Sequence, residues 1–362
     1  MLIYLSLFLW GICASYIYAH KKGREKKQHD VIYALSIILP IVLVSAFRGD
    51  VGTDTQRIYY PYFLNYIVGN NKYMGKEIGF LLFTRLTNKI YPSYSAFLFF
   101  IALLIWSVYY YTILHTKELK ENYVLLFSGL FCIFFAPSLN IMRQSIACAL
   151  IFGAYITIIQ QNLKKFILIL FIAMTFHTSA ILFFPMYYIY YFLNDKYKTV
   201  KTVFIIVLCV AIIFLFPIMF QVMGHFELFE KYTTNYSGMV SFTMRWNKIL
   251  VRLPLYISEI ISFVIIRKKK IPDTRMLFYL VAIVIECASI LFGFYMEWAF
   301  RLSYYFSLAH IFYWNYCVIE LKSVRNKQVL SVYVILLYIL YFIICHIRLG
   351  YDQIFPYAVS LS

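Results

Sequence analysis

Short polar side chains gather around an arginine early in the sequence, in the segment FRGDVGTDTQRIYYPYF at 47–63. Arg48 is followed by Thr53, Asp54 and Thr55, and Tyr59 is the first of three tyrosines in the segment. Two glycines three residues apart permit a tight turn or a left-handed backbone. The segment is suited to binding sugar hydroxyls and ring faces, although a turn with an Asx motif accounts for it equally well.

Arginines also stand where predicted membrane helices begin. The helix predicted over 141–160 carries Arg143 and Gln144 in its first turn, after the breaker APSLN, whose Asn140 we expect to be the N-cap. Arg301 holds a similar place in a later helix. Helix N-termini favour anions, and a guanidinium grips phosphate oxygens two at a time. The pattern predicts a ligand with a phosphate at the membrane surface and an apolar tail in the lipid. Snorkelling is the alternative for any arginine taken alone.

His177 is the first candidate for a group that accepts a proton. A helix rising from Lys165 at about 1.5 Å per residue would place His177 about 18 Å deep in a roughly 30 Å core. A polar bend at that depth should line a cavity, and a structural hydrogen bond that closes a hairpin is the alternative. Asp54 and Glu77 are the other candidates for the base, and Glu77 also suits the dipole of a helix start.

No sequence pattern indicates a metal or a cofactor. The seven cysteines fall in apolar segments without CxxC or Cys/His spacing, and no DxD motif occurs. We therefore expect neither, and arginines would have to stabilise a phosphate leaving group. Glu259 and Glu286 lie in apolar spans and are interpreted as structural or cavity residues. His310 shows no partner in the sequence.

The composition places the chain in a lipid bilayer. Of its 362 residues, 63% are hydrophobic and 14% are charged, and the mean hydropathy is +0.75. A soluble protein is about a quarter charged. The net charge of +17 does not indicate nucleic-acid binding, because the Lys and Arg residues mostly separate apolar stretches.

The fold class predicted is an all-α, polytopic integral membrane protein in one multi-pass domain, 1–362, with a cavity open to the extracytoplasmic side. An extracytoplasmic loop is expected at 48–94 with a short helix at 77–90, and another loop at 218–248. The first apolar run precedes KKGREKK and is expected to be retained as a span. About ten spans are predicted, at 2–19, 31–47, 95–114, 122–138, 141–160, 200–217, 249–266, 274–294, 300–319 and 329–347.

The segment 166–193 is too long for one upright span and too short for two, and its middle is polar. We interpret it as a re-entrant helical hairpin, because this choice puts every strongly basic loop on one face, with both termini outside the cytoplasm. A single crossing would instead move RKKK at 267–270 outside. With the hairpin, the outer basic residues are five Lys and eight Arg, whereas Lys dominates the cytoplasmic loops. This bias suggests that an outer ligand needs guanidinium groups.

Six short segments together resemble the EpsG family of bacterial exopolysaccharide proteins, which is related to Wzy-type polysaccharide polymerases. They follow the family's order over nearly the whole chain, although 194–296 adds little. The segments are RGDVGTDT at 48–55, KEIGFLLFTRL at 76–86, NIMRQSIACAL at 140–150, FHTSAILFFP at 176–185, RLSYYF at 301–306 and FPY at 355–357.

The resemblance implies a polymerase at the outer face of the bacterial cytoplasmic (inner) membrane. Such an enzyme transfers a growing glycan from undecaprenyl diphosphate to the non-reducing end of an incoming lipid-linked repeat unit. It implies lipid-linked oligosaccharide and membrane lipid as partners, with a chain-length regulator protein as a further candidate and no nucleic acid. In this interpretation Arg48, Arg143 and Arg301 hold the diphosphates, and His177 or a carboxylate is the base.

Two alternative functions stay open at this stage. A ligase would move the glycan to a different acceptor from the same donor. A flippase would transport the lipid-linked oligosaccharide without chemistry. Gln144, Thr53, Thr55 and Tyr59 are further candidates for binding the substrate or its diphosphate.

Overall fold

Helices account for nearly all regular structure in the computed structural model, which describes residues 1–21, 26–68, 77–119, 122–195, 197–223, 246–269, 273–294 and 297–360. Within these ranges the extended pairing is an isolated antiparallel bridge between Arg48 and Val359. The helices divide into two units, one formed by 1–184 with 317–362 and one formed by 185–316. The chain is an all-α polytopic membrane protein, as the sequence predicts.

Seven helices among the described residues are long and apolar enough to cross a membrane. Three further predicted spans correspond to other helices, namely α11 (Lys198–Met223), α14 (Leu253–Lys269) and α16 (Ser303–Glu320). The total number of spans, their orientation and the outer cavity stay predictions. The seven spans are Leu2–His20, His29–Ala46, Tyr94–His115, Tyr123–Asn140, Met142–Ile159, Thr274–Phe292 and Val324–Arg348.

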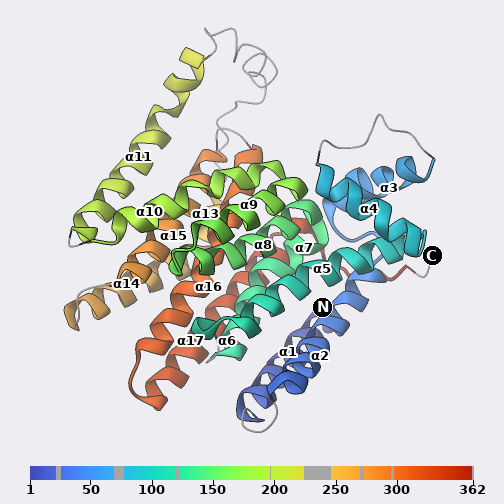
Figure 1. Cartoon of the computed structure of the whole chain (residues 1–362), viewed down its shortest axis with the longest axis horizontal. Helices are drawn as coiled ribbons and strands as arrows, with labels where there is room; N and C mark the ends of the chain where they lie inside the picture. The colour runs from blue at the N-terminus through green and yellow to red at the C-terminus, as the bar shows by residue number, and fades with distance from the viewer. Residues whose placement is uncertain are drawn as a thin grey trace. The chain divides into compact units, whose positions relative to one another are not determined.

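The first unit is built around a rod of apolar residues that runs from Tyr123 to Asn140. This rod comprises α6 (Tyr123–Leu130), a π-helical turn (Phe131–Phe135) and α7 (Ala136–Asn140), and nearly all its side chains are buried. A helix that is apolar on all sides is expected at the centre of a bundle. The helices around it include α1 (Leu2–Lys21), which packs on α6 and lies beside α2 (Lys26–Ala46), both blue in Figure 1. α17 (Val324–Phe342) also packs on α6.

Two antiparallel helices of this unit position the candidate site. α8 (Met142–Ile159) and α9 (Leu163–Phe176) pack along each other and are joined by a short turn. Asn162 caps α9, since its side chain accepts a hydrogen bond from the backbone N–H of Lys165 at 3.0 Å. The hairpin brings the beginning of α8 and the end of α9 to the same end of the bundle.

The predicted loop at 48–94 contains helices of its own. After the π-helical turn Thr55–Tyr59 come α3 (Tyr60–Ile67) and α4 (Ile78–Ile90). α4 packs on α9 and on α5 (Tyr94–His115), and α5 packs on α2 and α8. The predicted helix at 77–90 thus corresponds to α4, which covers the end of the α8–α9 hairpin.

The segment 166–193 is interrupted where its polar residues lie. α9 ends at Phe176, a 3-10 helix covers Thr178–Phe183, and α10 covers Pro185–Leu193. Because α10 belongs to the second unit, a re-entrant path for this segment stays a prediction. The predicted loop at 218–248 lies largely outside the described residues, and α11 extends into it as far as Met223.

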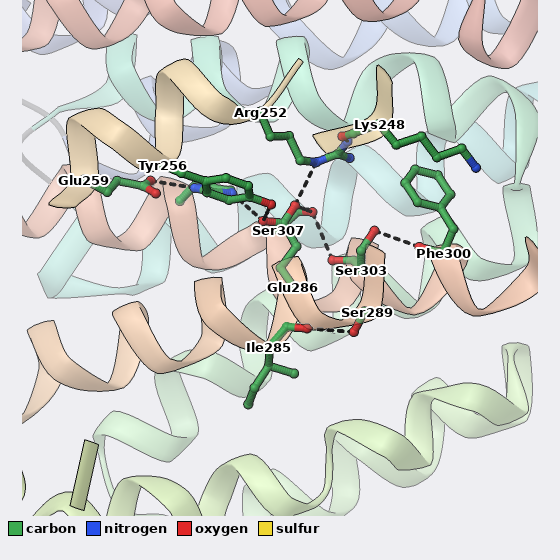
Figure 2. A network of polar contacts seen from close by, with 11 residues as sticks. Lys248, Arg252, Tyr256, Glu259, Ile285, Glu286, Ser289, Phe300, Ser303 and Ser307 are labelled. Carbon is green, nitrogen blue, oxygen red and sulfur yellow. Dashed lines mark hydrogen bonds and ion pairs between the residues drawn. The ribbon is translucent and has the colours of Figure 1, made fainter. Parts of the chain in front are cut away.

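The second unit consists mainly of α10, α11, α14, α15 (Thr274–Phe292) and α16, with the short helix α13 (Asn247–Leu250). α10 and α11 both pack on α15. α14, α15 and α16 follow one another in the chain, and contacts between their side chains form the polar core of this unit (Figure 2).

Candidate active site

The Glu77 carboxylate contacts two other candidate residues from the sequence, His177 and Arg143. One oxygen of its carboxyl group, Oε1, lies 2.6 Å from Nδ1 of His177, and the other, Oε2, lies 2.5 Å from Nη1 of Arg143. The His177 and Arg143 side chains are about one-quarter exposed, at 25% and 26%, whereas that of Glu77 is 9% exposed. A buried carboxylate thus holds a histidine and an arginine side by side, and both remain accessible.

The three residues meet because each lies at the end of a helix. Arg143 is in the first turn of α8, and His177, with extended backbone (φ −154°, ψ 111°), follows the last residue of α9. Glu77 precedes α4, also with extended backbone. Two ends of one hairpin and the start of the covering helix therefore converge.

Gly79 allows α4 to approach α9 closely enough for these contacts. A Cβ atom at Gly79 would lie 2.3 Å from Oγ1 of Thr175 and 3.0 Å from the Thr175 carbonyl carbon. Any other residue would have to push the two helices apart. The absence of a side chain at Gly79 thus sets the distance between Glu77 and His177.

Aromatic rings support the guanidinium of Arg143. Its Cζ atom lies 5.8 Å from the ring centroids of both Tyr59 and Phe80, within the range of a cation–π attraction. The backbone N–H of Arg143 also donates to the hydroxyl oxygen of Tyr59 at 3.1 Å. Arg143 is therefore fixed at its backbone and along its side chain.

The electrostatics favour a charged carboxylate at Glu77. Burial acts to raise the pKa of this carboxyl group, but the hydrogen bond from His177 and the charge of Arg143 outweigh it and hold the pKa below its usual range. An ionised carboxylate only accepts hydrogen bonds, so Nδ1 of His177 carries the proton in their contact. In a neutral imidazole with its proton on Nδ1, Nε2 on the other side of the ring is the acceptor.

The 48–55 loop is packed against the break between α7 and α8. The Arg48 guanidinium is buried and donates to the carbonyl oxygens of Ser45 and Leu139, both at 2.9 Å. Thr55 is also buried and donates to the Val51 carbonyl at 2.8 Å. Gly52, at φ +95°, has the left-handed backbone that the glycine spacing suggested. In this arrangement Arg48 contacts protein carbonyls, and its part in binding diphosphate stays a prediction.

Asn140 is the place where the sequence interpretation was wrong. It does not cap α8, since the N-cap position is Ile141 and carries no side-chain cap. The segment APSLN is itself helical, as α7, and the break comes at Ile141. Pro137 lies in the first turn of α7, directly after the π-helical turn Phe131–Phe135. The Asn140 side chain instead accepts hydrogen bonds from Oγ1 of Thr53 and the backbone N–H of Asp54.

The remaining predicted site residues fall into two groups. Asp54, Tyr59 and Gln144 are buried in the first unit, close in sequence to the groups described above. Arg301 is exposed in the second unit, in the 3-10 helix Glu297–Leu302. The site-residue assignments of all these positions stay predictions.

Sequence reasoning missed the network in the second unit that Figure 2 shows, centred on Glu286. Oε1 of Glu286 accepts from Nε of Arg252 at 3.0 Å and from Ser307 at 2.6 Å. Oε2 accepts from the hydroxyl of Tyr256 at 2.9 Å and contacts Nε2 of His310 at 2.8 Å. Arg252, just before α14, Tyr256 on α14, and Ser307 and His310 on α16 thus surround one buried carboxylate.

His310 links this carboxylate to a second one. Its Nδ1 lies 2.5 Å from Oε1 of Glu259, so both glutamates of the apolar spans share one histidine. A sequence signal existed in the spacing of Ser303, Ser307 and His310, which puts three polar groups on one face of α16. The partners lie on α14 and α15, which the sequence alone does not pair.

A family model described as EpsG family matches residues 31–359. No curated protein and no solved structure matches the chain. The match covers nearly the whole sequence, including Glu77, Arg143 and His177. The chain therefore belongs to the EpsG family, a family of Wzy-like polysaccharide polymerases.

Proposed function

We propose that the protein polymerises an exopolysaccharide from lipid-linked repeat units at the outer face of the bacterial cytoplasmic membrane. The donor is a growing glycan on undecaprenyl diphosphate, and the acceptor is the non-reducing end of an incoming lipid-linked repeat. The observation that carries this proposal is the bridge from Glu77 to both His177 and Arg143. It supports the proposal because an imidazole, which can accept a proton, and a guanidinium, which can bind phosphate, contact the same carboxylate.

In the proposed step, a hydroxyl of the acceptor sugar attacks the anomeric carbon of the donor. A new carbon–oxygen bond forms while the bond from the anomeric carbon to the diphosphate oxygen breaks. The electron pair leaves with undecaprenyl diphosphate, and the hydroxyl proton passes to Nε2 of His177. Glu77 orients the imidazole through Nδ1 and stabilises the imidazolium that results, as the aspartate of a catalytic triad does.

Arg143 stabilises the charge that develops on the leaving diphosphate. Its guanidinium has five N–H donors in a flat fork, so one nitrogen can keep the bond to Glu77 while others bind phosphate oxygens. The beginning of α8 adds the positive end of a helix dipole. We propose that this stabilisation makes the transfer independent of a metal ion, with Arg48 and Arg301 as further diphosphate ligands.

Polymerisation of a defined lipid-linked repeat by the purified protein tests the proposal. In nanodiscs, the wild type should convert single repeats into a ladder of longer products, and release of undecaprenyl diphosphate should match the number of bonds formed. Replacing His177 by Ala should lower the rate by about 10²-fold or more. Full activity of His177→Ala would remove His177 as the base.

The nanodisc assay, together with deletion of the gene in cells, separates the alternative functions. A ligase would attach the glycan once to a different acceptor and would give no ladder. A flippase would give no new glycosidic bond, and its deletion in cells would leave lipid-linked units on the cytoplasmic side. A polymerase deletion would instead accumulate single repeats outside.

A further inference from the structure

The C-terminal turn over residues 350–353 has an unusual backbone. Gly350, Asp352 and Gln353 have φ angles of +65°, +64° and +47°. Residues with a side chain adopt this left-handed region only where surrounding contacts hold them there. The contacts are partly with the 48–55 loop, since the backbone N–H of Gly52 donates to the carbonyl of Gln353 at 3.1 Å. The turn is thus held against the loop that packs on the start of α8.

The Asn140 amide joins this turn to the loop. Its Nδ2 donates to Oδ1 of Asp352 at 2.8 Å, while its Oδ1 accepts from Oγ1 of Thr53 at 2.9 Å and from the N–H of Asp54 at 2.7 Å. The second oxygen of Asp352 lies 3.3 Å from Nδ1 of His346. Only a side chain with both a donor and an acceptor can make these contacts at once.

This amide lies immediately before the helix that carries Arg143. Asn140 is the last residue of α7, the backbone breaks at Ile141, and α8 begins at Met142. Because α8 has no side-chain cap of its own, contacts from other segments fix the path of the chain at the break. The Asn140 amide provides three of them.

We propose that Asn140 and Asp352 are positioning residues that hold Arg143 in place for the diphosphate. They act through the beginning of α8 and not by contact with the reacting atoms. The inference rests on the proposed role of Arg143 as a diphosphate ligand. It implies that the C-terminal turn affects the reaction, although this turn lies more than 200 residues from Arg143 in the sequence.

The first test replaces Asn140 by Asp, which sets two carboxylates against each other. We expect kcat/KM for a defined lipid-linked repeat, measured with the full-length protein in nanodiscs, to fall about tenfold or more. The exchange Asn140→Asp with Asp352→Asn should restore kcat/KM to within about threefold of the wild type, because the new amide at 352 donates to the new carboxylate at 140.

The second test asks whether Asn140 acts through Arg143. Arg143→Lys should itself lower kcat/KM by about tenfold. If Asn140 works by placing Arg143, then Asn140→Asp should lower kcat/KM by less than about threefold in the Lys background. A purely structural loss would instead multiply with the effect of the Lys variant.

Two further variants complete the design. Asp352→Ala removes the carboxylate without adding repulsion and should lower kcat/KM by about threefold or more. This variant replaces Asn140→Asp as the test if Asn140→Asp does not fold. Asn162→Asp is the matched control, because a carboxylate can accept the same bond from Lys165 at the start of α9, and it should retain wild-type kcat/KM.

The outcomes separate the two proposals. Full activity of Arg143→Lys would contradict the proposed role of Arg143 itself. An impaired Arg143→Lys combined with wild-type kinetics of Asn140→Asp and Asp352→Ala would overturn only the positioning role. The positioning role would also be overturned if the exchange variant folds but its kcat/KM stays low. It would likewise be overturned if the effects of Asn140→Asp and Arg143→Lys on kcat/KM multiply.

Discussion

The charge on Glu77 should make the stability of the protein depend on pH in a defined window. Because the folded state lowers the pKa of this carboxyl group below its ordinary value of 4.5, its contacts stabilise the fold fully above that value. The contribution is lost as pH falls through the lower, folded pKa. We expect the wild type to unfold at a higher temperature than Glu77→Gln at pH 7, and the difference to shrink below about pH 4.5.

Thermal unfolding in detergent from pH 7 to about pH 3 would check this prediction. Asp50→Asn, at an exposed position, is the control and should match the wild type throughout. A difference between the wild type and Glu77→Gln that grows toward acid pH would contradict the assigned direction of the pKa.

The buried carboxylate of Glu286 should contribute more to folding than its hydrogen bond with Ser307 does. Glu286→Gln would leave the Arg252 guanidinium, which is 3% exposed, without its ion pair, and loss of one buried partner costs about 3–5 kcal/mol. Ser307→Ala removes one hydrogen bond to a charged group, at a cost of about 1.5–3 kcal/mol. The yield and unfolding temperature of both variants would rank them, and equal values would argue against a charged Glu286.

Individual residues could be proposed from the sequence, but their partners could not. Glu77 and Arg143 were candidates because of their residue types and their places at predicted helix starts, and His177 was a candidate because of its place at a predicted polar bend. The bridge between them depends on contacts across about 65 to 100 residues of chain. Asn140 was misassigned for a related reason, since its partner Asp352 lies 212 residues away.

At the scale of elements, the close contact of α4 with α9 should depend on Gly79. An added methyl group would collide with Thr175 and move α4, and Glu77 with it, away from His177. We therefore expect Gly79→Ala to lower the polymerisation rate about tenfold or more, although Ala favours helix by about 1 kcal/mol over Gly.

Gly153→Ala in α8 is the matched control. A Cβ there would lie 3.4 Å from Oγ1 of Thr112, which is close to ordinary contact, so the rate should stay within about twofold of the wild type. If Gly79→Ala retained the full rate, the spacing of α4 and α9 would not set the geometry of the site.

Hydropathy predicted the positions of the helices well but predicted the breaks between them less well. The apolar runs at 2–19, 95–114 and 274–294 correspond closely to α1, α5 and α15. The segment APSLN looked like a breaker because it holds Pro and Asn, yet Pro137 lies in the first turn of α7, where proline is tolerated. Burial of this rod on all sides overrides the local preference of its residues.

At the scale of the whole molecule, the α8–α9 hairpin allows the orientation in the membrane to be measured. Our proposal places the end with Arg143 and His177 outside and the joining turn inside. In a background without reactive cysteines, Arg57→Cys should react with a membrane-impermeant maleimide added to intact spheroplasts. Gln161→Cys, at an exposed position in the turn, should react only after the membrane is opened. The opposite pattern would place the site in the cytoplasm.

The composition predicted the membrane environment and the fold class without help from contacts, because an apolar surface is a property of the whole chain. Sidedness rests on weaker signals from the basic loops. The buried network around Glu286 shows the limit of such reasoning, since carboxylates in apolar spans indicate that partners exist but do not say which helices supply them.

The hairpin of α8 and α9 carries the proposed leaving-group ligand and the proposed base on one continuous stretch of 142–177. Both groups would be inherited together in any recombination that exchanges this stretch between relatives. The aromatic and hydroxyl groups of the 48–68 segment belong to a separate part of the gene. Preference for a different sugar could therefore evolve there while the bond-forming chemistry stays intact.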